Sequence, residues 1–177
     1  MQVDPKDAEF IHGCVERSRA GPPAVRDAVR GLSEDDARRR PGVGKLSIIQ
    51  HLQHMLDMER DVFNVRLRRV LEEDNPRLDP VNQEHLIEEH EIGDRPYADI
   101  LDEWERLRLE NVLLVQRTSE ADWQRPVRHP DVGEKATFAD VVARWARHDG
   151  EHVRQIEILA RNAHERGLPG QPGPSAS

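Results

Sequence analysis

The stretch TFADVVARWARHDGEHVRQIEILARNAHE, residues 137–165, decides the fold. At 100° per residue its apolar side chains fall on one stripe, which predicts an amphipathic helix that begins after the N-cap Thr137. The stripe consists of Phe138, Val141, Val142, Trp145, Val153, Ile156 and Leu159. A helix of about 28 residues is roughly 40 Å long. We therefore expect it to pack against other long helices.

Helical periodicity also dominates the rest of the chain, and alternating patterns typical of strands are scarce. We expect a first helix over residues 5–19, which the GPP at 21–23 should kink or restart because proline lacks the amide donor. Ser47 is the expected N-cap of a second long helix that ends near residue 74, and a third helix is expected over 97–116. The stretch RHPDVGEK, residues 128–135, is expected to be a loop. Four principal helices predict an all-α fold of the four-helix-bundle type.

The composition is typical of one soluble domain. The 177 residues include 34 acidic and 26 basic side chains, so the formal net charge is −8, and the basic residues are scattered among carboxylates. This charge distribution disfavours a nucleic-acid partner, and no apolar run approaches the ~18 residues that would cross a membrane. We expect a single domain over residues 1–166. The remainder, GLPGQPGPSAS at 167–177, is expected to be a disordered tail because it is rich in glycine and proline.

The first residues and the single cysteine bear on the cellular compartment. MQVDPKDAEF, residues 1–10, contains acidic residues and lacks the apolar core of a secretion signal, so we expect a cytoplasmic protein. Cys14 stands alone, which excludes an intramolecular disulfide and a cysteine-rich zinc module. We interpret Cys14 as a small buried hydrophobic residue.

Two histidines, His148 and His152, lie within or beside the apolar stripe of the last helix. Their i, i+4 spacing places both rings on one face, where two ring nitrogens can converge on a single metal ion. A partly buried histidine that is hydrogen-bonded to a carboxylate or a carbonyl satisfies the same pattern, so the spacing leaves both interpretations open. Asp149 lies close to the inner face, where it is placed to accept a hydrogen bond from a metal-binding histidine.

The second helix carries two more histidines, His51 and His54, in HLQHMLDMERDVF at 51–63. Its apolar arc is wide, with His51 near one edge and His54 further out, so helical geometry slightly favours His51 as the inward ring. Glu59 falls in the middle of the arc, and a buried carboxylate needs a partner or a proton. We expect Glu59 to pair with an arginine or a histidine across the bundle, in preference to a catalytic role. The remaining histidines, at positions 12, 85, 90, 129 and 164, are expected to be solvated.

Two segments resemble a known family. The stretch PGVGKLSIIQHLQHMLDMERDVFNVRLRRVLEEDNP, residues 41–76, resembles the first metal-ligand region of the DinB-like superfamily, and HDGEHVRQIE, residues 148–157, resembles its closing motif. With the approach HPDVGEKATFADVVARWA at 129–146, the resemblance covers most of residues 24–162. It implies a four-helix bundle of the DinB-like type with a long crossover connection, frequently a homodimer.

The resemblance further implies a divalent metal ion bound by three histidines. Matched position by position, the metal ligands are His54, His148 and His152. The resemblance thus selects His54 where helical geometry slightly favours His51. Leu46 stands where the family usually has tryptophan, which removes an aromatic packing residue but no ligand.

Three neutral imidazoles leave the charge of a divalent ion uncompensated and at least one coordination position open, as in reactive metal sites. Water or a thiol bound there becomes more acidic. Because enzymes similar to this chain include metal-dependent transferases that use bacillithiol, mycothiol or glutathione, we predict S-transfer of a low-molecular-weight thiol to an electrophilic small molecule.

Alternatives to this activity stay open. They are a metal-dependent hydrolase or isomerase, and a noncatalytic stress-related helical bundle. Zinc or nickel is the favoured cofactor, and iron, cobalt or manganese also suit three nitrogen ligands. No catalytic residue is identified beyond the candidate ligands.

Overall fold

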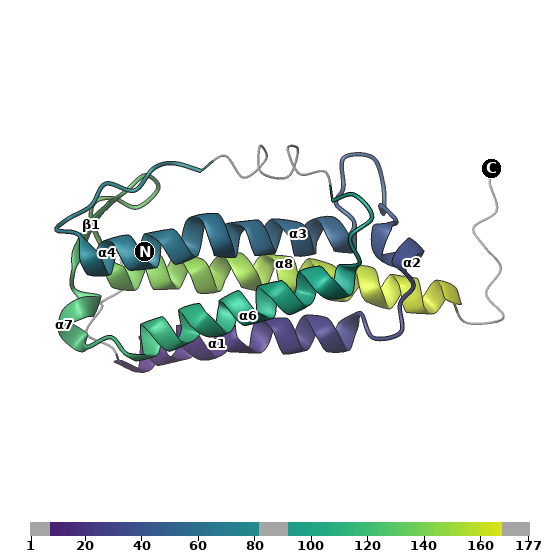
Figure 1. The fold of residues 1–177 in the computed structure, drawn as a ribbon, viewed down its shortest axis with the longest axis horizontal. Helices are drawn as coiled ribbons and strands as arrows, with labels where there is room; N and C mark the ends of the chain where they lie inside the picture. The colour runs from purple at the N-terminus through teal and green to yellow at the C-terminus, as the bar shows by residue number, and fades with distance from the viewer. Residues whose placement is uncertain (1–7, 82–91, 168–177) are drawn as a thin grey trace.

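The computed structural model describes residues 8–81 and 92–167 of the chain. Within these ranges, four helical rods lie side by side along the long axis (Figure 1). The rods are α1 (Ala8–Ala28), the continuous run of α3 (Ile48–Asp57), η1 (Met58–Phe63) and α4 (Asn64–Glu72), then α6 (Tyr97–Gln116) and α8 (Phe138–Gly167). The fold is the predicted all-α four-helix bundle.

The rods form two parallel pairs. The rod of α3, η1 and α4 runs in the same direction as α6, and α1 runs in the same direction as α8 (Figure 1). Because α4 ends at one end of the bundle and α6 begins at the other, residues 73–96 must connect the two ends. This connection is the predicted long crossover.

Helix α1 corrects one prediction, because it continues through Pro22 and Pro23. Pro22 lacks the amide that would donate to the carbonyl of Ser18 in a regular helix. That carbonyl instead accepts a hydrogen bond of 2.8 Å from Nη1 of Arg108, which reaches across from α6. A tertiary contact thus replaces the lost helical hydrogen bond, and the helix does not restart after the two prolines.

The second helix begins as predicted at Ser47, whose side chain and that of Gln50 form a reciprocal capping box. Its middle is a π-helix, η1, which the sequence pattern did not predict. Single π-helical turns inside α-helices are often found at functional sites. The third helix has the predicted bounds of 97–116, and α8 begins directly after the predicted N-cap Thr137.

The segment before α8 corrects a second prediction. The expected loop contains an antiparallel hairpin of β1 (Pro126–His129) and β2 (Gly133–Thr137). Gly133 has φ of +112°, a conformation that L side chains rarely adopt, so glycine suits this turn. Val127 and Ala136 are buried in the core, and the hairpin therefore covers one end of the bundle.

The core consists of two apolar clusters with a polar layer between them. Trp104 belongs to one cluster and Val112 to the other, with Arg108 between them on α6. On α8, Trp145 and Ile156 likewise belong to different clusters, and His148 and His152 lie between them. The candidate site therefore lies at mid-height in the bundle.

Three smaller findings complete the fold. Cys14 is buried, as predicted. No helix of the described part of the chain is both long enough and apolar enough to cross a membrane. Apart from Gly167, the last residue of α8, the predicted tail lies outside the described residues, and so do His85 and His90.

Candidate metal centre

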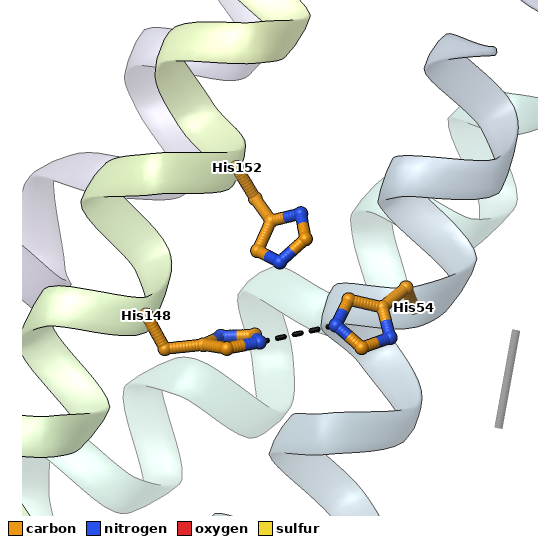
Figure 2. A group of neighbouring side chains, drawn as sticks. All are labelled: His54, His148 and His152. Carbon is orange, nitrogen blue, oxygen red and sulfur yellow. Dashed lines mark hydrogen bonds between the residues drawn. The ribbon is translucent and has the colours of Figure 1, made fainter. Parts of the chain in front are cut away.

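Two helices bring three histidines together at the middle of the bundle. His54 lies in the last turn of α3, and His148 and His152 lie one turn apart on α8. Each offers one ring nitrogen, and these three atoms all lie within 4.8 Å of one another. Figure 2 shows the three rings turned toward one another, with the Nε2 atoms of His54 and His148 3.1 Å apart. Residues 8–81 and 92–167 contain no other such group of three metal-binding side chains.

The donor set fits a metal ion. Two nitrogens bound to one tetrahedral zinc ion at 2.0–2.1 Å are separated by about 3.3 Å, close to the 3.1 Å between His54 and His148. The outer Nδ1 atoms of these two rings are buried and have no hydrogen-bond partner in the described structure. Nitrogen donors of this kind suit first-row divalent ions, such as zinc and nickel.

Burial keeps the rings of His54 and His152 neutral. It lowers the pKa of His54 to about 3, and the neighbouring His148 and His51 lower it further. Burial also lowers the pKa of His152 to about 2, with contributions from the same group of histidines. Since neutral imidazole is the form that binds metal, His54 and His152 present lone pairs near neutral pH without first releasing protons.

His51 lies beside the cluster. Its side chain is buried, as helical geometry predicted, but its ring nitrogens do not belong to the group of three. Its Nδ1 instead lies 3.0 Å from Nδ1 of His152. Both histidines of α3 therefore face inward, and His54 is the one whose nitrogen converges with those of α8.

A second polar group surrounds Arg108 and extends from α6 to α3–η1 and α8. Arg108 Nη2 donates to Oε2 of Glu59 at 2.6 Å, which confirms the prediction that Glu59 pairs with an arginine across the bundle. Asn111 donates to the other oxygen at 2.6 Å, and Trp145 Nε1 donates to Oε2 at 3.0 Å. Both oxygens of this fully buried carboxylate are thus occupied.

Asp149 joins the two groups. One of its oxygens accepts a hydrogen bond from Arg108, and the other lies 3.8 Å from Nδ1 of His148. Asp149 is buried on the inner face, as predicted, but this second distance exceeds that of a hydrogen bond. Burial alone would lower the pKa of Arg108, yet Asp149 and Glu59 raise it above its usual value. Arg108 therefore remains charged between two carboxylates.

His129 corrects the prediction that the other histidines are solvated. It is only 3% exposed, because the hairpin folds it against α4. Its Nδ1 accepts a hydrogen bond from the amide of Asp131 at 3.1 Å. Burial, followed by Arg66 and Arg144, lowers its pKa to about 4. The sequence pattern did not predict this burial because the segment was expected to be a loop. His12 and His164 are exposed, as predicted.

Comparison with known families identifies the chain. A family model described as the DinB superfamily matches residues 19–156, a range that includes all three clustered histidines. The chain belongs to the DinB superfamily. The resemblance seen in the two histidine-containing segments is therefore confirmed.

Relatives of this DinB-superfamily chain are named for metal-dependent chemistry. A protein from Geobacillus thermodenitrificans (strain NG80-2), named "Putative metal-dependent hydrolase", is 24% identical over 154 residues, covering 87% of this chain and 86% of that protein. The solved structure of YfiT from Bacillus subtilis is similar with a TM-score of 0.77 at 18% identity, covering 89% of this chain and 90% of YfiT. YfiT is described as "a probable metal-dependent hydrolase with an unusual four-helix bundle topology". At this identity, the similarity to YfiT shows the shared fold.

Proposed function

We propose that this protein is a metal-dependent hydrolase of a small-molecule substrate, with His54, His148 and His152 as the ligands of one divalent ion. The observation that carries the proposal is the convergence of three ring nitrogens within 4.8 Å. The names of the Geobacillus relative and of YfiT support hydrolysis as the reaction class.

The ligand set favours a reactive site. The three candidate ligands are neutral and include no carboxylate, so they leave the charge of the ion uncompensated. A divalent ion held there supplies a Lewis acid that lowers the pKa of a bound water or thiol. His54 is buried, whereas His148 and His152 are partly exposed. A small molecule therefore approaches from the side on which the rings of α8 meet solvent.

Glu59 serves the fold in this proposal. A general base must be within reach of the proton that it takes up, but both oxygens of Glu59 accept hydrogen bonds from side chains of α6 and α8. Its role is to hold Arg108, and through Arg108 to hold Asp149 near His148.

S-transfer of a low-molecular-weight thiol is the second candidate activity. It is supported by the family resemblance of the two histidine-containing segments. It is also supported by the neutral ligand set, because an uncompensated dication stabilises a bound thiolate as it stabilises a deprotonated water. The substrate in this case would be an electrophilic small molecule.

Metal identity, oligomeric state and location belong to the proposal as well. We favour zinc or nickel, and iron, cobalt or manganese also suit three nitrogen donors. The homodimer is implied by the family resemblance, and the cytoplasmic location is predicted from the first residues of the chain; both stay predictions. Light scattering on the purified protein tests the homodimer.

The test begins with metal-free protein that is reconstituted with one equivalent of each candidate ion. Cleavage of chromogenic esters and anilides measures hydrolysis, and consumption of bacillithiol or glutathione with 1-chloro-2,4-dinitrobenzene measures S-transfer. His152→Ala should abolish the metal-dependent rate, and His129→Ala, a buried histidine outside the cluster, should retain it. Metal-dependent thiol consumption without ester or amide cleavage would favour S-transfer. A protein that binds none of the ions would support the noncatalytic bundle instead.

A further inference from the structure

The three clustered histidines differ in what their outer nitrogens contact. The Nδ1 atoms of His54 and His148 are buried without a hydrogen-bond partner in the described structure. Nδ1 of His152 lies 3.0 Å from Nδ1 of His51, and the two rings are inclined by 62°. Of the three, only His152 therefore has its outer nitrogen within hydrogen-bond distance of another side chain of the described residues; Nδ1 of His148 lies 3.8 Å from Asp149.

The identity of these atoms restricts where the protons can be. Figure 2 shows one ring nitrogen of His152 directed toward His54 and His148. Since Nδ1 faces His51, the inward nitrogen is Nε2. A nitrogen that binds a metal must have a free lone pair, so the proton of a neutral His152 must be on Nδ1. Nδ1–H of His152 then donates to His51, whose own proton must be on Nε2.

We propose that His51 is a positioning residue, which accepts the Nδ1–H of His152 and thereby directs the Nε2 lone pair of His152 toward His54 and His148. The inference rests on the proposed metal site and deepens it. Partners of this kind fix the tautomer and the orientation of a metal-binding imidazole. Helix α3 thus supplies one ligand, His54. It also supplies His51, three residues earlier, which supports the ligand His152 on α8.

A role of His51 as a fourth ligand is less consistent with the contacts. Its Nδ1 is occupied by the contact with His152. Its ring nitrogens also lie outside the group of three that converge within 4.8 Å. His51 therefore contacts His152 from the outer side and leaves a coordination position of the ion open for water or a substrate.

Zinc affinity of matched variants tests the role. His51→Leu keeps similar bulk but removes the acceptor, and we expect zinc affinity, measured by competition with a chelator, to fall by about 10- to 100-fold. His51→Asn places an oxygen near the position of Nδ1 and should retain zinc affinity to within about threefold of the wild type. His129→Leu is the control, a buried histidine outside the cluster that should leave zinc affinity unchanged.

The tautomers of the wild type provide a second readout that general destabilisation does not change. In the zinc-loaded protein, long-range ¹H–¹⁵N spectra should show His152 protonated at Nδ1 and His51 protonated at Nε2. This measurement needs no variant, so it decides the question even where His51→Leu fails to fold.

The outcomes separate the two proposals. A wild type that binds none of the candidate ions overturns the proposed metal site, and the role of His51 with it. A wild type that binds zinc tightly, together with an equally tight His51→Leu variant or a His51 protonated at Nδ1, overturns only the role of His51. Reduced affinity of His51→Leu, rescue by His51→Asn and the expected tautomers together support it.

Discussion

The two buried polar groups at the centre of the bundle differ in the partners of their polar atoms. Glu59 receives donors on both oxygens, and its partner Arg108 lies between two carboxylates. In the histidine cluster, the ring nitrogens face one another, and the Nδ1 atoms of His54 and His148 have no partner in the described structure. The first group pairs its charges within the fold, although Nε of Arg108 has no hydrogen-bond partner in the described structure. The second turns ring nitrogens that can offer lone pairs toward one another, as expected of a site that binds an ion.

The largest expected effect breaks the group around Arg108. Arg108→Met leaves Glu59 and Asp149 as buried charges without a counterion, and we expect a loss of about 3–5 kcal/mol in the free energy of unfolding. Urea denaturation measures it. Arg106→Met on the same helix is the control, because Arg106 pairs with Glu110 at the exposed surface and should cost at most about 1 kcal/mol. Equal losses in the two variants would contradict the importance of the buried group.

The second-largest effect is expected when the histidine cluster is broken. His54→Ala or His152→Ala removes one of three ligands, and we expect metal affinity to fall by about 100-fold or more, which is about 2.7 kcal/mol. Elemental analysis of the purified variants, beside chelator competition, measures this loss. His164→Ala, an exposed histidine on the same α8, should bind metal as the wild type does. Retention of metal by both cluster variants would refute the assignment of the ligands.

A third prediction concerns His129, a histidine that is buried but lies outside the metal-binding cluster. The folded-state pKa of His129 is about 4, below the value near 6.5 expected in the unfolded chain. Between these values the unfolded chain binds more protons, so His129 contributes stability above pH 6.5 that is lost as the pH falls toward 4.

The free energy of unfolding that His129 contributes should fall by up to about 1.4 kcal/mol per pH unit in this range. His129→Asn preserves an acceptor for the amide of Asp131 and should reduce this slope, while its metal affinity at neutral pH stays that of the wild type. Urea unfolding at several pH values between 7 and 5 measures the slope. An unchanged slope would mean that His129 takes up no proton on unfolding.

The smallest effect concerns the start of the helix that carries His54. Ser47→Ala removes the hydroxyl that accepts a hydrogen bond from the Gln50 amide, while the backbone amide of Ser47 can still donate to Oε1 of Gln50. We expect a loss of about 1 kcal/mol in the free energy of unfolding. Metal affinity should change little, since the cluster lies about two turns further along. Thermal unfolding followed by circular dichroism measures the stability. A large loss of metal affinity would indicate that the helix start controls the site.

The site was predicted in part from the residues and in part from the family resemblance. The i, i+4 spacing of His148 and His152 placed both rings on one face of α8, and the structure has them there. Helical geometry slightly favoured His51 over His54, and it was a weak guide because the apolar arc of their helix is wide and both side chains are buried. The resemblance selected His54, and its nitrogen is the one that converges with those of α8.

The sequence by itself determined the features that depend on short-range interactions. The bounds of α6, the cap at Ser47 and the start of α8 after Thr137 follow from periodicity and capping, which act within one or two turns. The need of Glu59 for a partner follows from the cost of a buried charge.

Only the tertiary structure decided the features that depend on distant segments. α1 continues through Pro22 because Arg108, 90 residues away from Ser18, satisfies the freed carbonyl. The partners of Glu59 come from two other helices, and His129 is buried because a hairpin closes over α4. Local periodicity contains no information about such contacts, because their partners are brought together only when the helices pack.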